Sequence, residues 1–167
     1  MSRNTKRMII LSDSITRPAD TTQYAAGDVI SAVTTDNHHT LDSKMGGQLR
    51  GAIESARMAV NANQATKPDL ELWLFSVDIA EVADNGAFAQ TDAEILTLID
   101  VIDFAVAGWK VGLAGSGASG NIIQVERELN IPLPATKGII YGQLVARNTY
   151  TPIASEQFAV YLNITLD

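Results

Sequence analysis

The sequence predicts an all-β protein, a β-sandwich or a β-barrel of about eight strands with one short helix. Three observations predict this class. Runs of alternating apolar and polar residues recur along most of the chain, Gly and Pro fall between these runs, and a single segment carries helical spacing. No repeat with a period of roughly 20–50 residues is present, which argues against a solenoid or a propeller.

The composition is that of one globular domain with an acidic surface. The chain has 167 residues, of which 46% are hydrophobic and 19% charged, so it can build a core without staples. The absence of cysteine excludes disulfides, thiolate metal sites and cysteine nucleophiles. The formal net charge of −7 disfavours binding to nucleic acid or anionic membranes. No apolar run approaches the ~18 residues of a membrane span.

Basic residues gather at the N-terminus. Arg3, Lys6 and Arg7 lie within the first seven positions of a chain that has 12 basic residues in all. We therefore expect a basic N-terminal arm over residues 1–7 and a single β-sandwich domain over residues 8–167. A short basic arm on an acidic body can dock on an acidic partner. The apolar stretch after the arm is too short for a signal peptide, so we expect a cytoplasm-like compartment or release without secretion.

The first strand is expected over residues 8–16, followed by a turn over residues 17–22. Asp13 falls on the apolar face of this strand, so it needs a partner or a place at the strand edge. A short second strand is expected over residues 29–33, and the polar residues 34–47 predict a surface loop. The apolar face of the first strand consists of Ile9, Leu11 and Ile15.

Two further strands are expected before the middle of the chain. Residues 48–60 alternate, but the phase of the alternation slips, which predicts a β-bulge near Ser55. Residues 70–77 are rich in β-forming residues and apolar on both faces beyond Glu71, so this strand is expected at the centre of a sheet, or with one face covered by another element.

A capping box marks the predicted helix. The sequence Thr91-Asp92-Ala93-Glu94 places a hydroxyl and a carboxylate at the spacing that caps a helix N-terminus, which predicts a helix over about residues 92–98. The β-branched residues that follow predict a strand over residues 99–106. Another short strand is expected over residues 109–113, where apolar and other residues alternate.

Three alternating runs close the chain. The prolines at the end of residues 123–133 predict a strand exit or a sheet edge. Residues 139–147 and 158–167 are expected to pair with each other around a Pro-containing connection over residues 148–156. Two strands cannot hide an apolar face alone, so upstream strands must cover it and make the last strand one inner wall of a two-sheet core. That face consists of Phe158, Val160, Leu162, Ile164 and Leu166.

One stretch matches a nucleotide-binding motif. Residues 115–120 read Gly-Ser-Gly-Ala-Ser-Gly, as in the Gly-x-Gly-x-x-Gly loop of dinucleotide-binding proteins. The residues that follow alternate with a period of two, so no helix N-terminus faces a phosphate. No acidic residue lies where one would hold a ribose. We therefore interpret this stretch as a flexible surface loop and expect no cofactor.

The residue types that commonly carry catalysis or bind metals are few. The only histidines, His38 and His39, are adjacent, so in an extended chain they point apart, and we interpret them as exposed loop residues. Asp78, Glu81 and Asp84 crowd one loop, for which calcium binding is an alternative and solvation the favoured interpretation. We expect no catalytic residue and no bound metal.

Two stretches resemble the sequence signatures of one protein family. Residues 14–30, Ser-Ile-Thr-Arg-Pro-Ala-Asp-Thr-Thr-Gln-Tyr-Ala-Ala-Gly-Asp-Val-Ile, resemble the N-terminal signature of small virion proteins of tailed bacteriophages. Residues 141–152, Tyr-Gly-Gln-Leu-Val-Ala-Arg-Asn-Thr-Tyr-Thr-Pro, followed by an alternating strand, resemble their C-terminal signature. The order of the two stretches at the two ends of the chain makes the resemblance more specific than either stretch alone.

The resemblance implies a capsid decoration (cement) protein with a jelly-roll-like antiparallel β-sandwich. Such proteins often sit as trimers over three-fold positions of a capsid and hold neighbouring copies of the major capsid protein together. On this basis we expect a non-enzymatic homotrimer on the capsid surface of a virion made in a bacterial host cytoplasm. From charge and expected exposure, the residues that contact the capsid or another subunit are predicted to include Arg3, Lys6, Arg7, Tyr150 and Pro152.

Two other functions stay open on the sequence alone. A carbohydrate- or receptor-binding β-sandwich of a phage tail or fibre would use Trp73 or Trp109 to stack on a sugar, although two core tryptophans are the commoner arrangement. A small hydrolase on a β-scaffold is the third hypothesis. The small number of histidines and the absence of cysteine argue against it.

Overall fold

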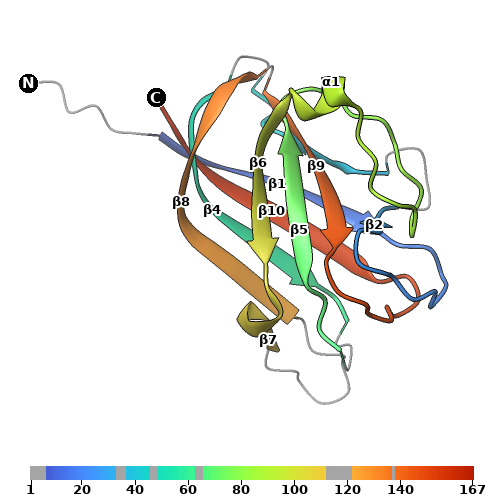
Figure 1. Cartoon of the computed structure of the whole chain (residues 1–167). Coiled ribbons are helices and arrows are strands. Elements are labelled where there is room, and N and C mark those ends of the chain that lie inside the picture. Colours follow the sequence, from blue (N-terminus) through green and yellow to red (C-terminus); the bar gives the residue numbers. More distant parts are fainter. Residues whose placement is uncertain (1–6, 33–36, 46–48, 63–65, 112–121, 137) are drawn as a thin grey trace, which may run out of the picture.

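Two antiparallel β-sheets pack face to face in this protein (Figure 1). The computed structural model describes residues 7–32, 37–45, 49–62, 66–111, 122–136 and 138–167. The first sheet contains β1 (Arg7–Thr16), β4 (Leu49–Val60), β7 (Lys110–Val111), β8 (Ile122–Thr136) and β10 (Gln157–Leu166) in the order β1-β10-β4-β8-β7. The second contains β2 (Val29–Ile30), β3 (His39–Asp42), β5 (Leu70–Phe75), β6 (Leu98–Phe104) and β9 (Ile139–Ala146) in the order β2-β9-β5-β6, with β3 also paired to β9.

The pairing between strands identifies the sandwich as a jelly roll. β1 pairs with β10, β2 and β3 pair in succession with β9, β4 pairs with β8, and β5 pairs with β6, all antiparallel. The pairs are nested, as if one long hairpin with its tip between β5 and β6 had been rolled into two sheets. Because β2 and β3 share one position beside β9 and β7 is only two residues long, the sandwich has eight main strand positions. The predicted jelly-roll-like sandwich of about eight strands is confirmed.

The last two long strands do not pair with each other, so that prediction was wrong. β9 lies in the second sheet and β10 in the first, and residues 147–156 carry the chain from one sheet to the other. A lone hairpin of these strands would leave its apolar face in water. Placing them in opposite sheets buries both apolar faces against each other.

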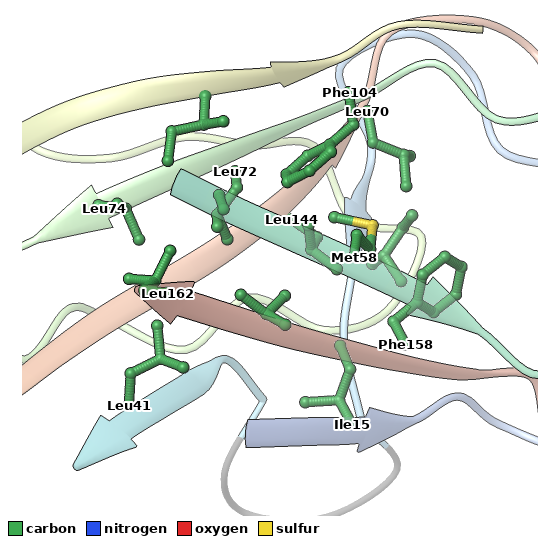
Figure 2. Close-up of a cluster of buried hydrophobic side chains, with 14 of the residues drawn as sticks. Ile15, Leu41, Met58, Leu70, Leu72, Leu74, Phe104, Leu144, Phe158 and Leu162 are labelled. Carbon is green, nitrogen blue, oxygen red and sulfur yellow. The ribbon is translucent and has the colours of Figure 1, made fainter. Parts of the chain in front are cut away.

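The core lies between the two sheets. The alternation in the last strand predicts its buried face correctly, because every second side chain from Phe158 to Ile164 is fully buried. Full burial of one such side chain contributes about 1.5–3 kcal/mol. Figure 2 shows side chains of both sheets meeting in this core; those labelled are Ile15, Met58, Phe158 and Leu162 from the first sheet and Leu41, Leu70, Leu72, Leu74, Phe104 and Leu144 from the second.

β4 contains the β-bulge that the phase slip predicts. Ser55 opposes Asn163 and Ile53 opposes Ile164, which leaves Glu54 with no opposite residue on β10. The extra residue moves the side-chain pattern by one position and keeps apolar residues on both sides of the bulge in the core. These residues are Ile53, Ala56, Met58 and Val60.

The capping box is present, but the helix is shorter than predicted. In α1 (Asp92–Ile95) the Thr91 hydroxyl accepts a hydrogen bond from the Glu94 N–H at 3.3 Å, and the Glu94 carboxylate accepts one from the Thr91 N–H at 2.8 Å. The chain returns to a strand at Leu98, because pairing with β5 suits the β-branched residues that follow. A 3-10 turn, η1 (Val106–Gly108), comes before β7.

Part of the segment predicted as a surface loop over residues 34–47 is a strand. β3 pairs with the first half of β9, and its residues His39 and Leu41 are fully buried. Four residues are too few to show a clear alternation. This segment forms a strand because it pairs with β9. The predictions for Val33 and for the Gly-rich residues 115–120 lie outside the described residues.

Candidate functional site

The two stretches that resemble phage virion proteins lie against each other in the structure. The Tyr24 N–H donates to the Tyr150 carbonyl at 3.0 Å, and the Gly27 N–H donates to the Ala146 carbonyl at 2.7 Å. The Tyr24 and Tyr150 rings stack with centroids 5.0 Å apart. Segments far apart in the sequence therefore form one unit at the end of the sandwich where β1 and β9 finish.

A buried ion pair lies beside the stacked rings. Arg17 is fully buried, its Nε donates to the Tyr24 hydroxyl, and its guanidinium lies 3.0 Å from the Asp84 carboxylate. The same carboxylate accepts the Tyr24 hydroxyl at 2.5 Å and the Ser31 N–H at 3.0 Å. Burial and the Asp84 charge raise the pKa of Tyr24, so this hydroxyl stays protonated and keeps donating. The network fixes three segments of the chain: the turn after β1, the residues on both sides of β2 and the loop after β5.

Glu156 is a second acid at this end of the sandwich, and it is buried. It is 1% exposed, and neither carboxylate oxygen has a hydrogen-bond partner among the described residues. Its backbone is held, because its carbonyl accepts the Arg17 N–H at 2.9 Å and its N–H donates to the Ile153 carbonyl at 3.1 Å. Burial raises the pKa of Glu156 to about 7, although the nearby Arg17 charge acts in the opposite direction. Glu156 therefore titrates near neutral pH.

The sequence did not reveal this cluster. Arg17 belongs to a stretch with turn chemistry, and Asp84 lies in an acidic loop for which solvation is predicted. The prediction for Asp84 was wrong, because its side chain is only 9% exposed. No local pattern links these two residues, which are brought together by the rolled topology. This network holds the backbones of the loops in place at one end of the sandwich.

The predicted contact residues differ in where the structure places them. Arg3 and Lys6 lie outside the described residues. Arg7 is exposed, but it opens β1 and pairs with Leu166, so the sheet starts one residue earlier than expected. Tyr150 and Pro152 are buried inside the protomer, so their side chains do not face a partner. The exposed residues of the connection over residues 147–156 are Arg147, Thr149, Thr151, Ile153, Ala154 and Ser155.

The two histidines are buried, which corrects the prediction of exposed loop residues. His39 Nδ1 lies 3.1 Å from Asp13, and the Thr40 N–H donates to the same carboxylate oxygen at 3.1 Å. Burial raises the pKa of Asp13, but the hydrogen bonds from His39 and Thr40 outweigh it and hold this pKa below its ordinary value. The expected partner for Asp13 is thus β3. His38 pairs with Asp78 at 3.2 Å.

The two tryptophans differ in environment. Trp109 is 9% exposed, and its Nε1 donates to the Pro68 carbonyl at 2.7 Å, which confirms the prediction of a core residue. Trp73 is half-buried, with its Nε1 donating to Glu71 at 2.9 Å and its ring tilted against Phe88 at 4.9 Å. Trp109 therefore presents no open ring face for a sugar.

A groove of about 600 Å³ crosses the outer face of the first sheet. Tyr161 lies in it, and the Arg57 guanidinium stacks 4.0 Å from the centre of the Tyr161 ring. Glu54 and Glu128 add acidic groups to the lining, and Ile10 closes it at the β1 side. Within the described ranges, no set of three His, Asp or Glu side chains is placed to hold a metal ion. No helix in those ranges is long and apolar enough to cross a membrane.

Comparisons with known proteins give structural likenesses only. No protein-family model and no curated protein matches the chain. A chain of the cyanophage Pam1 capsid asymmetric unit aligns with a TM-score of 0.38 and 10% identity, over 100% of this chain and 90% of that one. A chain of Desmodium yellow mottle tymovirus aligns with a TM-score of 0.31 and 10% identity, over 99% of this chain and 90% of that one. The BFDV capsid protein, from the structure of a 60-mer, aligns with a TM-score of 0.33 and 11% identity, over 99% of this chain and 95% of that one. The jelly-roll assignment rests on the strand pairing and not on these likenesses.

Proposed function

We propose that this chain is a non-enzymatic virion structural protein, a capsid decoration or cement protein that binds the major capsid protein lattice and stabilises the head. The observation that carries the proposal is the meeting of the two phage-like stretches at Tyr24 and Tyr150. Signatures at opposite ends of a chain gain weight when they form one packed unit, because a chance match in each would not require contact between them.

The buried polar groups support a structural role. Arg17, Tyr24 and Asp84 bind one another, and His39 binds Asp13, so these side chains hold segments of the fold together. The side chains of Arg17, Tyr24 and His39 are fully buried, so they do not face a substrate in solvent. Fold alone does not decide the function, since jelly rolls serve in capsids, lectins and cupins alike.

The proposed mechanism is multivalent docking. Each copy makes a modest contact with the shell, and many copies fixed on one shell gain avidity without new contacts. The proposal includes a homotrimer over three-fold positions of the outer capsid surface, with assembly in the bacterial host cytoplasm. The basic arm of residues 1–7 is proposed to reach an acidic patch on the capsid, because Arg3, Lys6 and Arg7 carry the charge opposite to that patch, whereas the whole chain has a net charge of −7.

Co-sedimentation with undecorated capsids of the phage that encodes the chain tests this function. We expect saturation at a fixed number of copies per shell, and weaker binding with a smaller salt dependence after Arg3, Lys6 and Arg7 are changed to Gln. A variant with Lys44, 85% exposed and outside the arm, changed to Gln is the matched control. Absence of binding, together with glycan binding that Trp73→Ala abolishes, would favour the receptor-binding alternative instead.

A further inference from the structure

We propose that two copies of this chain pair edge to edge through β1, about a two-fold axis, and continue the first sheet across the contact. The starting observation is an unprotected sheet edge. β1 stands at the end of its sheet, and among the described strands its hydrogen-bonded partner is β10 alone. Its ten pairs with β10, from Arg7–Leu166 to Thr16–Gln157, show no register shift. Proteins commonly blunt such edges with Lys, Pro, a bulge or an inward-pointing charge. β1 has no Lys, Pro or bulge, and its inward-pointing charge, Asp13, lies outside the N-terminal half of the strand and binds β3.

Two large apolar side chains stand in water on this strand. Met8 is 66% exposed and Ile10 is 64% exposed, whereas Leu11 on the opposite face is buried. β3 approaches β1 farther along, where His39 and Thr40 bind Asp13. The N-terminal half of β1 therefore combines an edge that no other described strand pairs with exposed apolar side chains, which are the two requirements for adding a strand.

The sequence of β1 identifies a second copy as the occupant. In a continuous antiparallel sheet with a two-fold axis perpendicular to it, directly opposed residues lie on the same face. An axis through Ile9 opposes Met8 to the Ile10 of the second copy, and Ile10 to its Met8. All four exposed apolar side chains then pair with one another. Arg7 opposes Leu11 in this register, so no like charges face each other.

Neighbouring registers fit less well. An axis through Ile10 opposes Met8 to Ser12 and extends the contact to Asp13, where β3 already lies against the strand. An axis through Met8 opposes Ile10 to Lys6, which leaves Ile10 without an apolar partner. The register centred on Ile9 is the one that covers both exposed side chains and stops before β3.

Engineered disulfides test the register, because the chain contains no native cysteine. Met8→Cys protein is mixed with Ile10→Cys protein, oxidised and analysed on a non-reducing denaturing gel. We expect the mixture to form several-fold more cross-linked dimer than either variant alone, since residues 8 and 10 oppose each other and neither opposes itself. Ser14→Cys, on the same face of β1 but beside β3, is the control and should stay monomeric on the gel.

Sedimentation velocity on the uncoupled proteins tests the contact itself. Ile10→Lys should weaken self-association roughly tenfold or more, because it places a charge opposite Met8, while Ser14→Lys should leave it unchanged. Equal cross-linking in the mixture and in the single variants, or self-association unaffected by Ile10→Lys, would overturn the proposal. In the wild type this contact joins monomers, or the homotrimers of the proposed function, and Ile10→Lys should remove only that step of association. The isolated protein is used throughout, so the outcome is independent of capsid binding.

Discussion

Tyr24 and Tyr150 stack with their ring centroids 5.0 Å apart and their planes within 17° of parallel. This contact joins the loop that follows β1 to the loop that follows β9, and the fully buried Arg17 lies over the Tyr24 ring at 4.8 Å. Buried polar side chains thus hold one end of the sandwich together. In the protein interior, loss of one partner leaves the other unpaired and lowers the stability of the fold.

Asp84→Ala should destabilise the protein by about 3 kcal/mol, because it removes the nearer of the two carboxylates of the buried Arg17 and leaves it the half-exposed Asp20 at 3.4 Å. The measurement is the free energy of unfolding from urea titration. Lys44→Met is the matched control, since it breaks a surface pair in which the Lys44 side chain is 85% exposed. That control should cost roughly 0–1 kcal/mol. Equal effects for the two variants would contradict the account of the buried pair.

Glu156 should make the protein less stable as the pH rises through neutrality. Burial raises its pKa from 4.5 to about 7 in the folded state, so the folded protein holds this proton more tightly than the unfolded chain does. The stabilising contribution is therefore full below about pH 4.5 and is lost as the pH rises through about 7. The largest loss is about 3 kcal/mol, by the usual conversion of a pKa shift into free energy.

Glu156→Gln isolates this contribution. The unfolding free energy of the variant should not show the fall that the wild type shows between about pH 4.5 and about pH 7, because the amide does not ionise. Carboxylates whose pKa is lowered, such as Asp13, titrate below this window in both proteins and cancel in the comparison. Parallel pH profiles for the two proteins would show that Glu156 is solvated in solution.

Gly51 should not tolerate a side chain. Its φ of 147° is rarely adopted by other residues, and a Cβ there would overlap the carbonyl oxygen of Thr165 on β10. Gly51→Ala should therefore lower the unfolding free energy by more than ~2 kcal/mol, since backbone must move in two paired strands. Gly27→Ala provides the comparison, because φ there is 96° but nothing lies near the added Cβ. It should cost roughly 1–2 kcal/mol.

Long strands and local signals could be predicted from the sequence. β10 alternates over its whole length because one face packs into the core and the other meets solvent. The slip near Ser55 and the Thr91–Glu94 capping box are local features, and the structure has both. In each case the deciding interactions lie within a few residues or along one strand.

Features that depend on distant segments could not be predicted. His39 and Leu41 are ordered by pairing with β9, about which their own four-residue strand contains no signal. Arg17 is buried because Asp84 reaches it, and a buried charge is rare without such a partner. Likewise, β9 and β10 are consecutive strands, and adjacency along the chain favours a hairpin until the whole topology places them in opposite sheets.

The most direct test of the proposed function is the thermal rupture of capsids with and without the protein. Undecorated shells are saturated with the chain, heated, and followed by the release of packaged DNA to an intercalating dye. The account predicts that decorated shells rupture at a higher temperature, and that the increase grows with the number of copies bound until the sites are full. An unchanged rupture temperature at full occupancy, or no occupancy at all, would contradict a cement role.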